Sequence, residues 1–333
     1  TSARSWHDDA SMGTPPSDEA LAREAILAAG TSLAADHIAV EAAAALRAVS
    51  VASLLLRGAS VARHLYDNGE TRAYVDADLL VPAGSRTQVE RVLRKMGFSH
   101  RAVLGQRSID RPAWSSTWFR DRDGGTVDLH WSLVGVRVGA DELWSTLLDH
   151  AESIPVLGVQ LDGLDAEATA LVVVLHAAHH GQAVPHPLAD LERALDRFDG
   201  RVWQRAIALA ERLEAGDAFA AGLRLRPNGV QLAARLGLPE SSRTETVLRA
   251  ASAPPMALGF EWLAQTQGVK RKLVFVAGKL IPDVEFMRAW SPVAGRGGSL
   301  GLALAYVWRP IWLLVHSGRG FWAWWQARRP ARR

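Results

Sequence analysis

The sequence predicts an α+β protein whose first half alternates short strands with helices and whose second half is helical. Segments rich in β-prone residues lie only at 54–56, 72–81 and 126–131. Beyond them, Ala, Leu and Arg recur at helical spacing. The length of 333 residues, with 48% hydrophobic and 22% charged residues, suits two globular domains and excludes a disordered chain.

Shifts in composition divide the chain into four regions. Residues 1–20 are polar, rich in Ser, Asp, Gly and Pro, and lack an apolar stretch, so we expect a disordered leader and not a signal peptide. We assign 21–162 to an α/β domain, 163–253 to a helical bundle domain and 254–333 to a basic, Trp-rich helical tail. The absence of cysteine excludes disulfides and thiolate metal sites.

Each element of the first domain has a local signal. Gly58 separates a strand from a helix, Ser85 can cap a helix, and Gly97 can end it. The turn residues Asp123-Gly124-Gly125 precede the last strand. We therefore expect a helix over 36–51, a strand over 54–56, a helix over 59–66, a strand over 72–81, a helix over 85–96 and a strand over 126–131.

The helical half begins with a helix over 165–180, which has an acidic first turn and a glycine terminator, Gly181. From 201 to 252 the helical spacing is broken at Gly216, Pro227 and Pro239, which predicts a bundle of short helices.

Two acidic residues interrupt an apolar strand. Alternate side chains of a strand point to one face, so Asp76 and Asp78 lie together. Carboxylates this close repel each other unless a cation lies between them, and their burial without one is costly. Mg²⁺ usually binds through one or two carboxylates plus substrate phosphates. The pair therefore predicts half of a metal site, and Asp128 completes it if the two strands are neighbours.

Upstream of these acids, a strand-to-helix turn from Gly58 to Ser60 predicts a phosphate site. Glycine lets a phosphate approach the backbone, and the first turn of the helix offers free N–H groups. Ser60 could instead support only the helix start, and Arg72 could pair with a carboxylate. The predicted phosphate-binding residues are Arg57, Gly58, Ala59, Ser60 and Arg72.

This order of motifs resembles the polymerase-β-like nucleotidyltransferases, in which Gly-x-Ser and a helix precede Asp-x-Asp and a later lone Asp. The chain is most similar to the uncharacterised bacterial nucleotidyltransferase family proteins over about residues 40–200. Arg57 stands where that family usually has lysine. The likeness is carried by Leu55-Leu56-Arg57-Gly58, Leu65-Tyr66, Arg72, Asp76-Ala77-Asp78, Gly97-Phe98 and Val127-Asp128-Leu129-His130-Trp131.

The resemblance implies a small mixed β-sheet flanked by helices, two Mg²⁺ ions, and transfer of an NMP group from an NTP, expected to be ATP. Asp76 and Asp78 would hold the ion that bridges the triphosphate, and Asp78 and Asp128 the ion near the acceptor hydroxyl. Asp128 could also take the acceptor proton. The acceptor would be a small molecule, peptide or protein.

Histidines gather on the helix over 165–180. His176 and His180 share one face, but no Glu lies between them, so the metalloprotease pattern fails. We expect packing or hydrogen-bonding roles, or contacts to the base or acceptor, for these two and for His130. Asp190 is predicted to orient one of the histidines.

The tail differs from the rest of the chain in charge. From residue 255 it holds 12 Lys or Arg against 3 Asp or Glu, and seven of the 13 tryptophans. A helical lid or docking face and membrane-surface contact through 300–333 are the alternatives. The apolar stretch 302–315 is broken by Arg309-Pro310 and is predicted to be too short to span a bilayer. No nucleic-acid partner is expected.

Two functions are consistent with these features. The first is a Mg-dependent, cytoplasmic nucleotidyltransferase that releases pyrophosphate. The alternative is a degenerate, non-catalytic nucleotide-binding or scaffold protein of a biosynthetic cluster, peripheral to the inner membrane.

Overall fold

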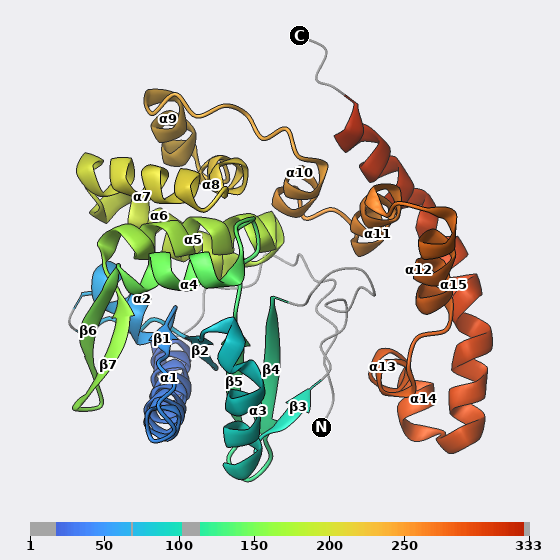
Figure 1. Cartoon of the computed structure of the whole chain (residues 1–333), viewed down its shortest axis with the longest axis horizontal. Helices are drawn as coiled ribbons and strands as arrows, with labels where there is room; N and C mark the ends of the chain where they lie inside the picture. The colour runs from blue at the N-terminus through green and yellow to red at the C-terminus, as the bar shows by residue number, and fades with distance from the viewer. Residues whose placement is uncertain (1–17, 68, 102–113, 330–333) are drawn as a thin grey trace.

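The computed structural model describes residues 18–67, 69–101 and 114–329, and it confirms the α+β fold (Figure 1). A five-stranded mixed sheet has the order β1-β2-β5-β4-β3, and β6 and β7 form a separate two-stranded sheet. The strands are β1 Leu54–Leu55, β2 Ala77–Leu80, β3 Ser99–Arg101, β4 Ser115–Arg120, β5 Gly125–His130, β6 Ala151–Val156 and β7 Val159–Leu164.

The central pair of the sheet, β2 and β5, is parallel, whereas the other neighbours are antiparallel. Side-chain alternation gives this pair two different faces. Leu79 and Leu129 point to one face, into a core that includes the helices α1 (Asp18–Arg47) and α3 (Arg86–Lys95). The opposite face, which carries Leu80, packs toward α5 (Ala166–His180).

The helix α5 is the centre of the second layer. It is buried along most of its length because other helices and the sheet surround it. Asp165 caps its first turn by accepting a hydrogen bond from Ala168 N at 2.9 Å, as the acidic start predicts. The remaining helices before the C-terminal region are α2 Ala59–Leu65, α4 Ala140–Leu148, α6 Pro185–Arg197, α7 Gly200–Arg212, α8 Gly216–Leu223, α9 Pro227–Arg235 and α10 Thr244–Ala250.

Some predicted bounds are wrong. The first helix begins at Asp18 and not at residue 36; the rest of the predicted leader lies outside the described residues. The strand predicted over 72–81 begins only at Ala77. Before it, Ser32 on α1 takes the backbone hydrogen bonds: its hydroxyl donates to Arg72 O (2.8 Å) and accepts from Tyr74 N (3.2 Å). These groups are therefore not available to a strand ladder.

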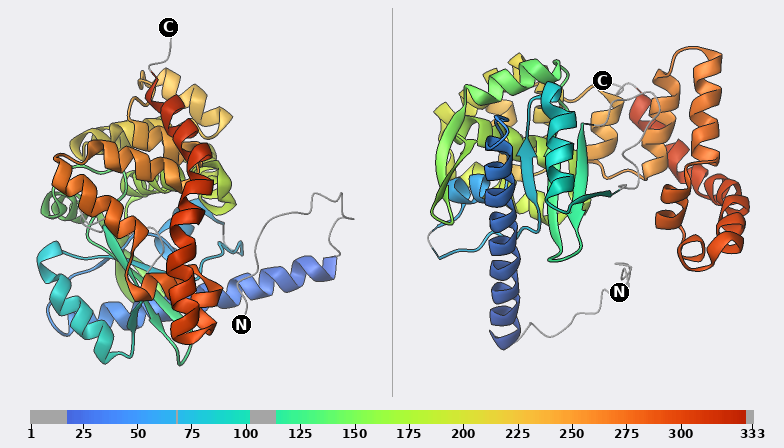
Figure 2. Two further views of the ribbon diagram at one scale, coloured as in Figure 1. Left: turned by 90° about the vertical axis from the view of Figure 1, so that its right-hand side faces the viewer. Right: turned by 60° about the horizontal axis from the view of Figure 1, so that its bottom comes forward.

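The C-terminal region forms an arm of helices beside the sheet domain (Figure 2). Its last helix runs without a break through Pro310, and by length and composition it is the one helix in the described part of the chain that could cross a membrane. The prediction that this apolar stretch is too short to span a bilayer is therefore wrong on those two criteria. The arm consists of α11 Pro255–Gln265, α12 Val269–Leu280, α13 Val284–Trp290, α14 Pro292–Arg296 and α15 Gly298–Arg328.

Candidate active site

Two of the predicted acids are direct neighbours across parallel strands. Asp78 on β2 is in register with Asp128 on β5, and both lie on the sheet face that points toward α5. Asp76 directly precedes β2, and its charge interacts with those of the other two carboxylates. The structure therefore places Asp78 and Asp128 side by side, with Asp76 within range of their charges.

Asp78 is the anchor of the site and is only 3% exposed. Arg57 binds both of its oxygens: Nε donates to Oδ2 at 2.7 Å, and the second contact joins Nη2 to Oδ1. His130 Nε2 lies 3.1 Å from Oδ1. Burial alone would raise the pKa of Asp78, but the Arg57 charge and these hydrogen bonds outweigh burial and hold the pKa well below its usual range.

The other two acids have the opposite shift. Burial, followed by the charges of Asp78 and Asp128, raises the pKa of Asp76 to about 7. Burial and the Asp78 charge also raise the pKa of Asp128. Asp128 Oδ1 is buried and has no hydrogen-bond partner among the described residues. Such a group is costly unless a ligand binds it.

These acids fit a divalent cation. Ligand atoms of Asp78, Asp128 and His130 all lie within 4.8 Å of one another, and the buried Asp128 oxygen supplies a free lone pair. Carboxylates are the ligands that Mg²⁺ prefers, whereas imidazole nitrogen is a ligand of zinc and other transition metals. Asp76 is not part of this compact set. His130, predicted only as a base or acceptor contact, thus lies among the candidate metal ligands.

The predicted phosphate turn is present, but one of its groups is engaged elsewhere. Gly58 has φ +61°, and a Cβ there would lie 3.2 Å from the Tyr74 ring, so the position requires glycine. Ser60 is buried at the start of α2, and its Oγ accepts a hydrogen bond from Leu164 N at 2.9 Å. The Ser60 hydroxyl therefore fastens α2 to β7, which is the structural alternative to a phosphate contact. Ala59 opens α2.

Arg72 follows the second of its two predicted alternatives. It precedes β2, and its guanidinium pairs with Asp190 on α6 through contacts of 2.7 to 3.1 Å. Tyr66 also donates to Asp190, at 2.9 Å. Among the described residues, the hydrogen-bond partners of Asp190 are Arg72 and Tyr66, so the expectation that it orients a histidine is wrong. The pair ties the segment before β2 to the helical layer.

The histidines of α5 lie beside the acids as neutral groups. His176 Nδ1 contacts Arg57 Nη1, and His179 Nδ1 lies 3.1 Å from Arg249. The His180 ring lies 4.6 Å from the rings of both. Burial first, and then the neighbouring arginine charges, lowers the pKa of all three below 6.5. A neutral His176 can accept from Arg57 and so helps to orient the guanidinium on Asp78.

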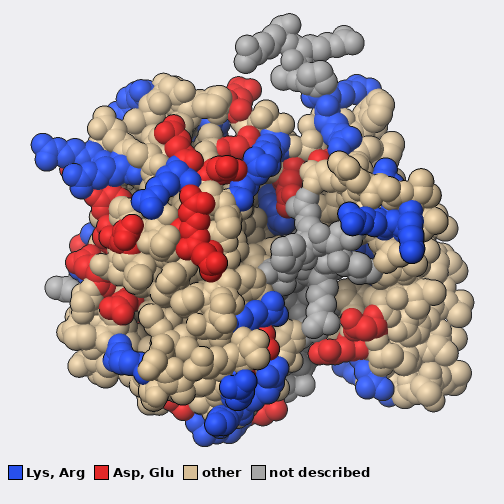
Figure 3. All heavy atoms as spheres, in the orientation of Figure 1, with Lys and Arg blue, Asp and Glu red and all other residues tan. Residues whose placement is uncertain are grey.

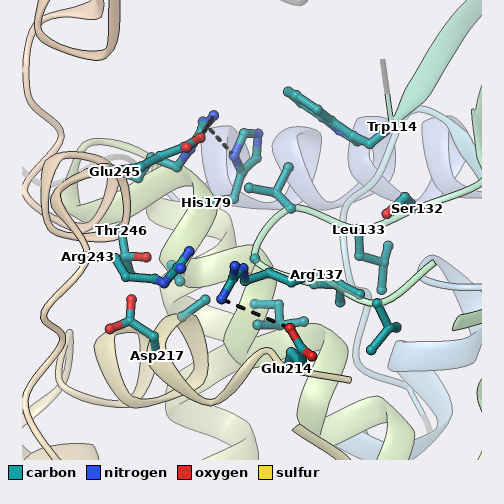
Figure 4. A pocket seen from close by; sticks show the side chains of 18 of the residues that line it. Trp114, Ser132, Leu133, Arg137, His179, Glu214, Asp217, Arg243, Glu245 and Thr246 are labelled. Atoms are coloured by element: carbon teal, nitrogen blue, oxygen red, sulfur yellow. Dashed lines mark hydrogen bonds and ion pairs between the residues drawn. The ribbon is translucent and has the colours of Figure 1, made fainter. Parts of the chain in front are cut away.

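A large cavity adjoins this group of side chains. It has a volume of about 900 Å³ and lies between the sheet domain, α10 and α11, with Trp114, Arg137, His179 and Glu245 among its walls (Figure 4). A smaller cavity of about 50 Å³ is lined by Arg57 and His130 and shares Trp114 and His179 with the large one. The smaller cavity therefore reaches two residues that contact Asp78, although none of the three acids is among the described residues that line either cavity.

The cavity walls come mostly from residues that no sequence motif marked. Arg137 lies in the loop after β5, Arg243 directly precedes α10, and Glu245 lies on α10. These segments meet only in the folded chain. Trp118 is buried in the core, whereas Trp114 and Trp131 line the cavity.

The raised pKa of Asp76 predicts that its contribution to the stability of the metal-free protein decreases as the pH rises. In the unfolded chain its carboxyl ionises near 3.8, whereas in the folded protein it keeps its proton to about pH 7. Between pH 3.8 and about pH 7 the folded state binds one proton more than the unfolded state. The free energy of unfolding therefore falls by up to about 1.4 kcal/mol for each pH unit in this range. The histidines change the stability in the opposite direction. Because their pKa is lowered in the folded protein, protonation below pH 6.5 favours the unfolded state and reduces stability.

Comparing Asp76→Asn with wild type separates the two effects. With EDTA present, the substitution should raise the melting temperature more at about pH 8 than at about pH 5, because only wild type carries the carboxylate charge. The histidines are the same in both proteins and cancel in the difference. If the difference in melting temperature between Asp76→Asn and wild type stays constant or becomes smaller as the pH rises, the Asp76 pKa is not raised.

Comparison with known proteins gives one match over most of the chain. The model of a family described as uncharacterised nucleotidyltransferase matches residues 5–227, more than half of the sequence. No curated protein matches the chain. This match agrees with the resemblance inferred from the motifs.

Two solved structures are similar to part of the chain. One is the solution structure of the antibiotic-resistance factor ANT(2'')-Ia, with 12% identity and a TM-score of 0.37 over 53% of this chain and 91% of that one. The other is an antigenic nucleotidyltransferase-like protein from Paracoccidioides brasiliensis, with 13% identity and a TM-score of 0.32 over 55% of this chain and 91% of that one. At these values neither structure supports an inference about substrate.

Proposed function

The chain belongs to the family of uncharacterised nucleotidyltransferases, and from this premise we propose that it transfers a nucleoside monophosphate from ATP to a hydroxyl of an acceptor. The observation that carries the proposal is the buried, unpartnered Asp128 oxygen in register with Asp78 on the neighbouring strand. A bound pair of Mg²⁺ ions would offset the triphosphate charge and stabilise the attacking and leaving oxygens. Asp76, Asp78 and Asp128 would hold these ions.

The residues of this chain have separate roles in the transfer. Asp128, whose pKa is raised, takes the proton of the acceptor hydroxyl as its oxygen bonds to the α-phosphorus. The bond from that phosphorus to the pyrophosphate oxygen breaks, and pyrophosphate leaves with the electron pair. Arg57 and the backbone at Gly58 lie next to the acids and offer positive charge and N–H groups to the leaving group.

The large cavity is the proposed acceptor site. Its volume of about 900 Å³ suits a small molecule or the end of a peptide, and its walls combine tryptophan with charged side chains. Arg137 lies 4.0 Å from Glu214, and Arg249 pairs with Glu245 at 3.1 Å, so the charges are largely balanced within the walls. This balance favours a polar acceptor of low net charge. We place the reaction in the cytoplasm, where ATP is available.

Calorimetry with ATP tests the proposal. Asp76→Asn should weaken Mg²⁺-dependent ATP binding at least about tenfold, because one of the ion-holding carboxylates is lost. Asp121→Asn, an exposed carboxylate in the β4–β5 turn, is the matched control and should leave binding unchanged. ATP binding that is equal with and without Mg²⁺ would remove the metal role of the three acids.

One observation favours the second candidate function, a non-catalytic nucleotide-binding protein. Arg57 contacts both oxygens of Asp78, so the guanidinium stands where a cation would bind this carboxylate. Incubation with labelled ATP and Mg²⁺ separates the two functions. An enzyme releases pyrophosphate when a suitable hydroxyl acceptor is added, whereas a binding protein retains intact ATP with every acceptor of a broad panel.

A further inference from the structure

The helix α15 carries an apolar stripe on its exposed side. The stripe residues are spaced by four or three positions, and by seven at the end, which places them on one side of a helix. Leu300 is 72% exposed and Leu314 is 75% exposed, so these side chains are not covered by the arm itself. We call this surface the apolar stripe; it consists of Leu300, Leu304, Val307, Ile311, Leu314 and Phe321.

The opposite side of α15 is firmly packed. Gly320 lets the helix approach Met256, since a Cβ there would lie 2.5 Å from the Met256 Cβ. Arg309 is buried, donates from Nε to Lys279 O at 2.8 Å, and stacks on Phe286. Because one side of α15 is held in this way, the apolar stripe is a fixed surface and not the result of a frayed helix.

Around the apolar stripe basic residues outnumber acidic ones, although exposed Asp283 and Glu285 lie at the start of α13, which contacts α15. The sequence contains no Asp or Glu from residue 286 to its end, whereas Arg296, Arg319 and Arg328 lie on or beside α15. The helix α12 contacts α15 and places exposed Lys270–Lys272 next to exposed Val269 and Leu273. In Figure 3 the surface over α12–α15 is mostly uncharged, with separate basic groups and a smaller acidic area. An apolar surface with an excess of basic residues suits a partner that is both apolar and anionic.

We propose that α12 and α15 bind an anionic lipid bilayer through the apolar stripe and the basic residues beside it. A bilayer offers acyl chains and anionic headgroups together, and exposed Trp308, Trp322 and Trp325 are of the type that gathers at this interface. A second copy of this chain fits less well, because the arm carries many more basic than acidic residues, so two stripes would bring mostly like charges together.

The helix lies in the plane of the interface and does not span the bilayer. By length it could span, but Arg309 lies near its middle and is held by Phe286 and by the Lys279 carbonyl. The helices packed on the other side of α15 also carry charged groups such as Glu261, which accepts hydrogen bonds from Trp324 (2.8 Å) and Arg328 (2.9 Å). A one-sided apolar surface matches an interfacial helix. This inference is independent of the nucleotidyl transfer.

Vesicle co-sedimentation of the full chain tests the proposal. The protein should bind vesicles of equal parts phosphatidylglycerol and phosphatidylcholine at low salt, and bind vesicles of phosphatidylcholine alone at least about tenfold more weakly. The double variant Ile311→Asp/Leu314→Asp should lose at least about tenfold in binding to the anionic vesicles, because it places charge in the apolar stripe. Both side chains are exposed, so the fold is retained, as circular dichroism will show.

The matched control is Ile26→Asp/Leu27→Asp on α1, which changes two exposed apolar residues far from the arm and should leave vesicle binding unchanged. Absence of binding to anionic vesicles at low salt overturns the proposal. Light scattering provides the other decisive outcome: a discrete dimer that Ile311→Asp/Leu314→Asp converts to monomer assigns the apolar stripe to a second copy and overturns the proposal as well.

Discussion

Asp128→Asn is expected to stabilise the metal-free protein while it abolishes the metal-dependent reaction. In the absence of metal, Asp128 lies beside Asp78, burial and the Asp78 charge raise its pKa, and one of its oxygens is buried without a partner among the described residues. Asparagine has almost the same shape without the charge, so the repulsion disappears. We expect a gain of about 1 kcal/mol, or about 2 °C in melting temperature for a protein of this size.

The same substitution should lower the rate of pyrophosphate release by about 100-fold or more, because it removes a metal ligand and the proposed proton acceptor together. It should also remove the rise in melting temperature that Mg²⁺ causes in wild type. Asp121→Asn, on the exposed turn, should change neither quantity. A variant that is destabilised without metal, or that still responds to Mg²⁺ as wild type does, would contradict the assignment of Asp128.

The second large effect is expected from Arg57→Ala, compared with Arg72→Ala. Each substitution breaks a buried arginine–aspartate pair: Arg57 with Asp78 and Arg72 with Asp190. Loss of one partner leaves a buried carboxylate uncompensated, which costs about 3–5 kcal/mol in unfolding free energy. Without metal, the two variants should therefore be destabilised to a similar extent, as urea denaturation will measure.

Added Mg²⁺ should separate these two variants. Asp78 lies within the candidate metal set, so a divalent cation can take the place of the missing guanidinium and restore much of the stability of Arg57→Ala. Asp190 lies outside that set, so Arg72→Ala should remain destabilised. Equal rescue of both variants, or of neither, would show that the cation does not bind at Asp78.

The sequence by itself determined the elements and faces that carry the acids. Strand periodicity puts Asp78 on the face opposite to Leu79, and Asp128 on the face opposite to Val127 and Leu129, because successive side chains alternate whatever their partners are. Glycine and acidic signals located the ends of α3 and α5 to within one or two residues. These are local properties, decided by a residue and its near neighbours in the chain.

Tertiary structure decided how distant residues meet. The parallel register of Asp78 with Asp128, the capture of Arg72 by Asp190 and the contact of Arg57 with Asp78 all join residues more than 20 positions apart. No local pattern specifies which of several buried arginines pairs with which carboxylate. The β6–β7 hairpin, which the sequence did not suggest, is likewise held by its packing beside β1 and α2.

In the helix α15, tertiary contacts outweigh a local signal that would end the helix. Read locally, Pro310 should end or kink a helix at a cost of about 3 kcal/mol, because proline lacks an N–H and its ring meets the preceding turn. In the folded chain, contacts along one side of the helix, from Gly301 through Arg309 to Gly320, offset that cost. Local chemistry thus set which side chains α15 carries, and only packing decided that they form one continuous surface.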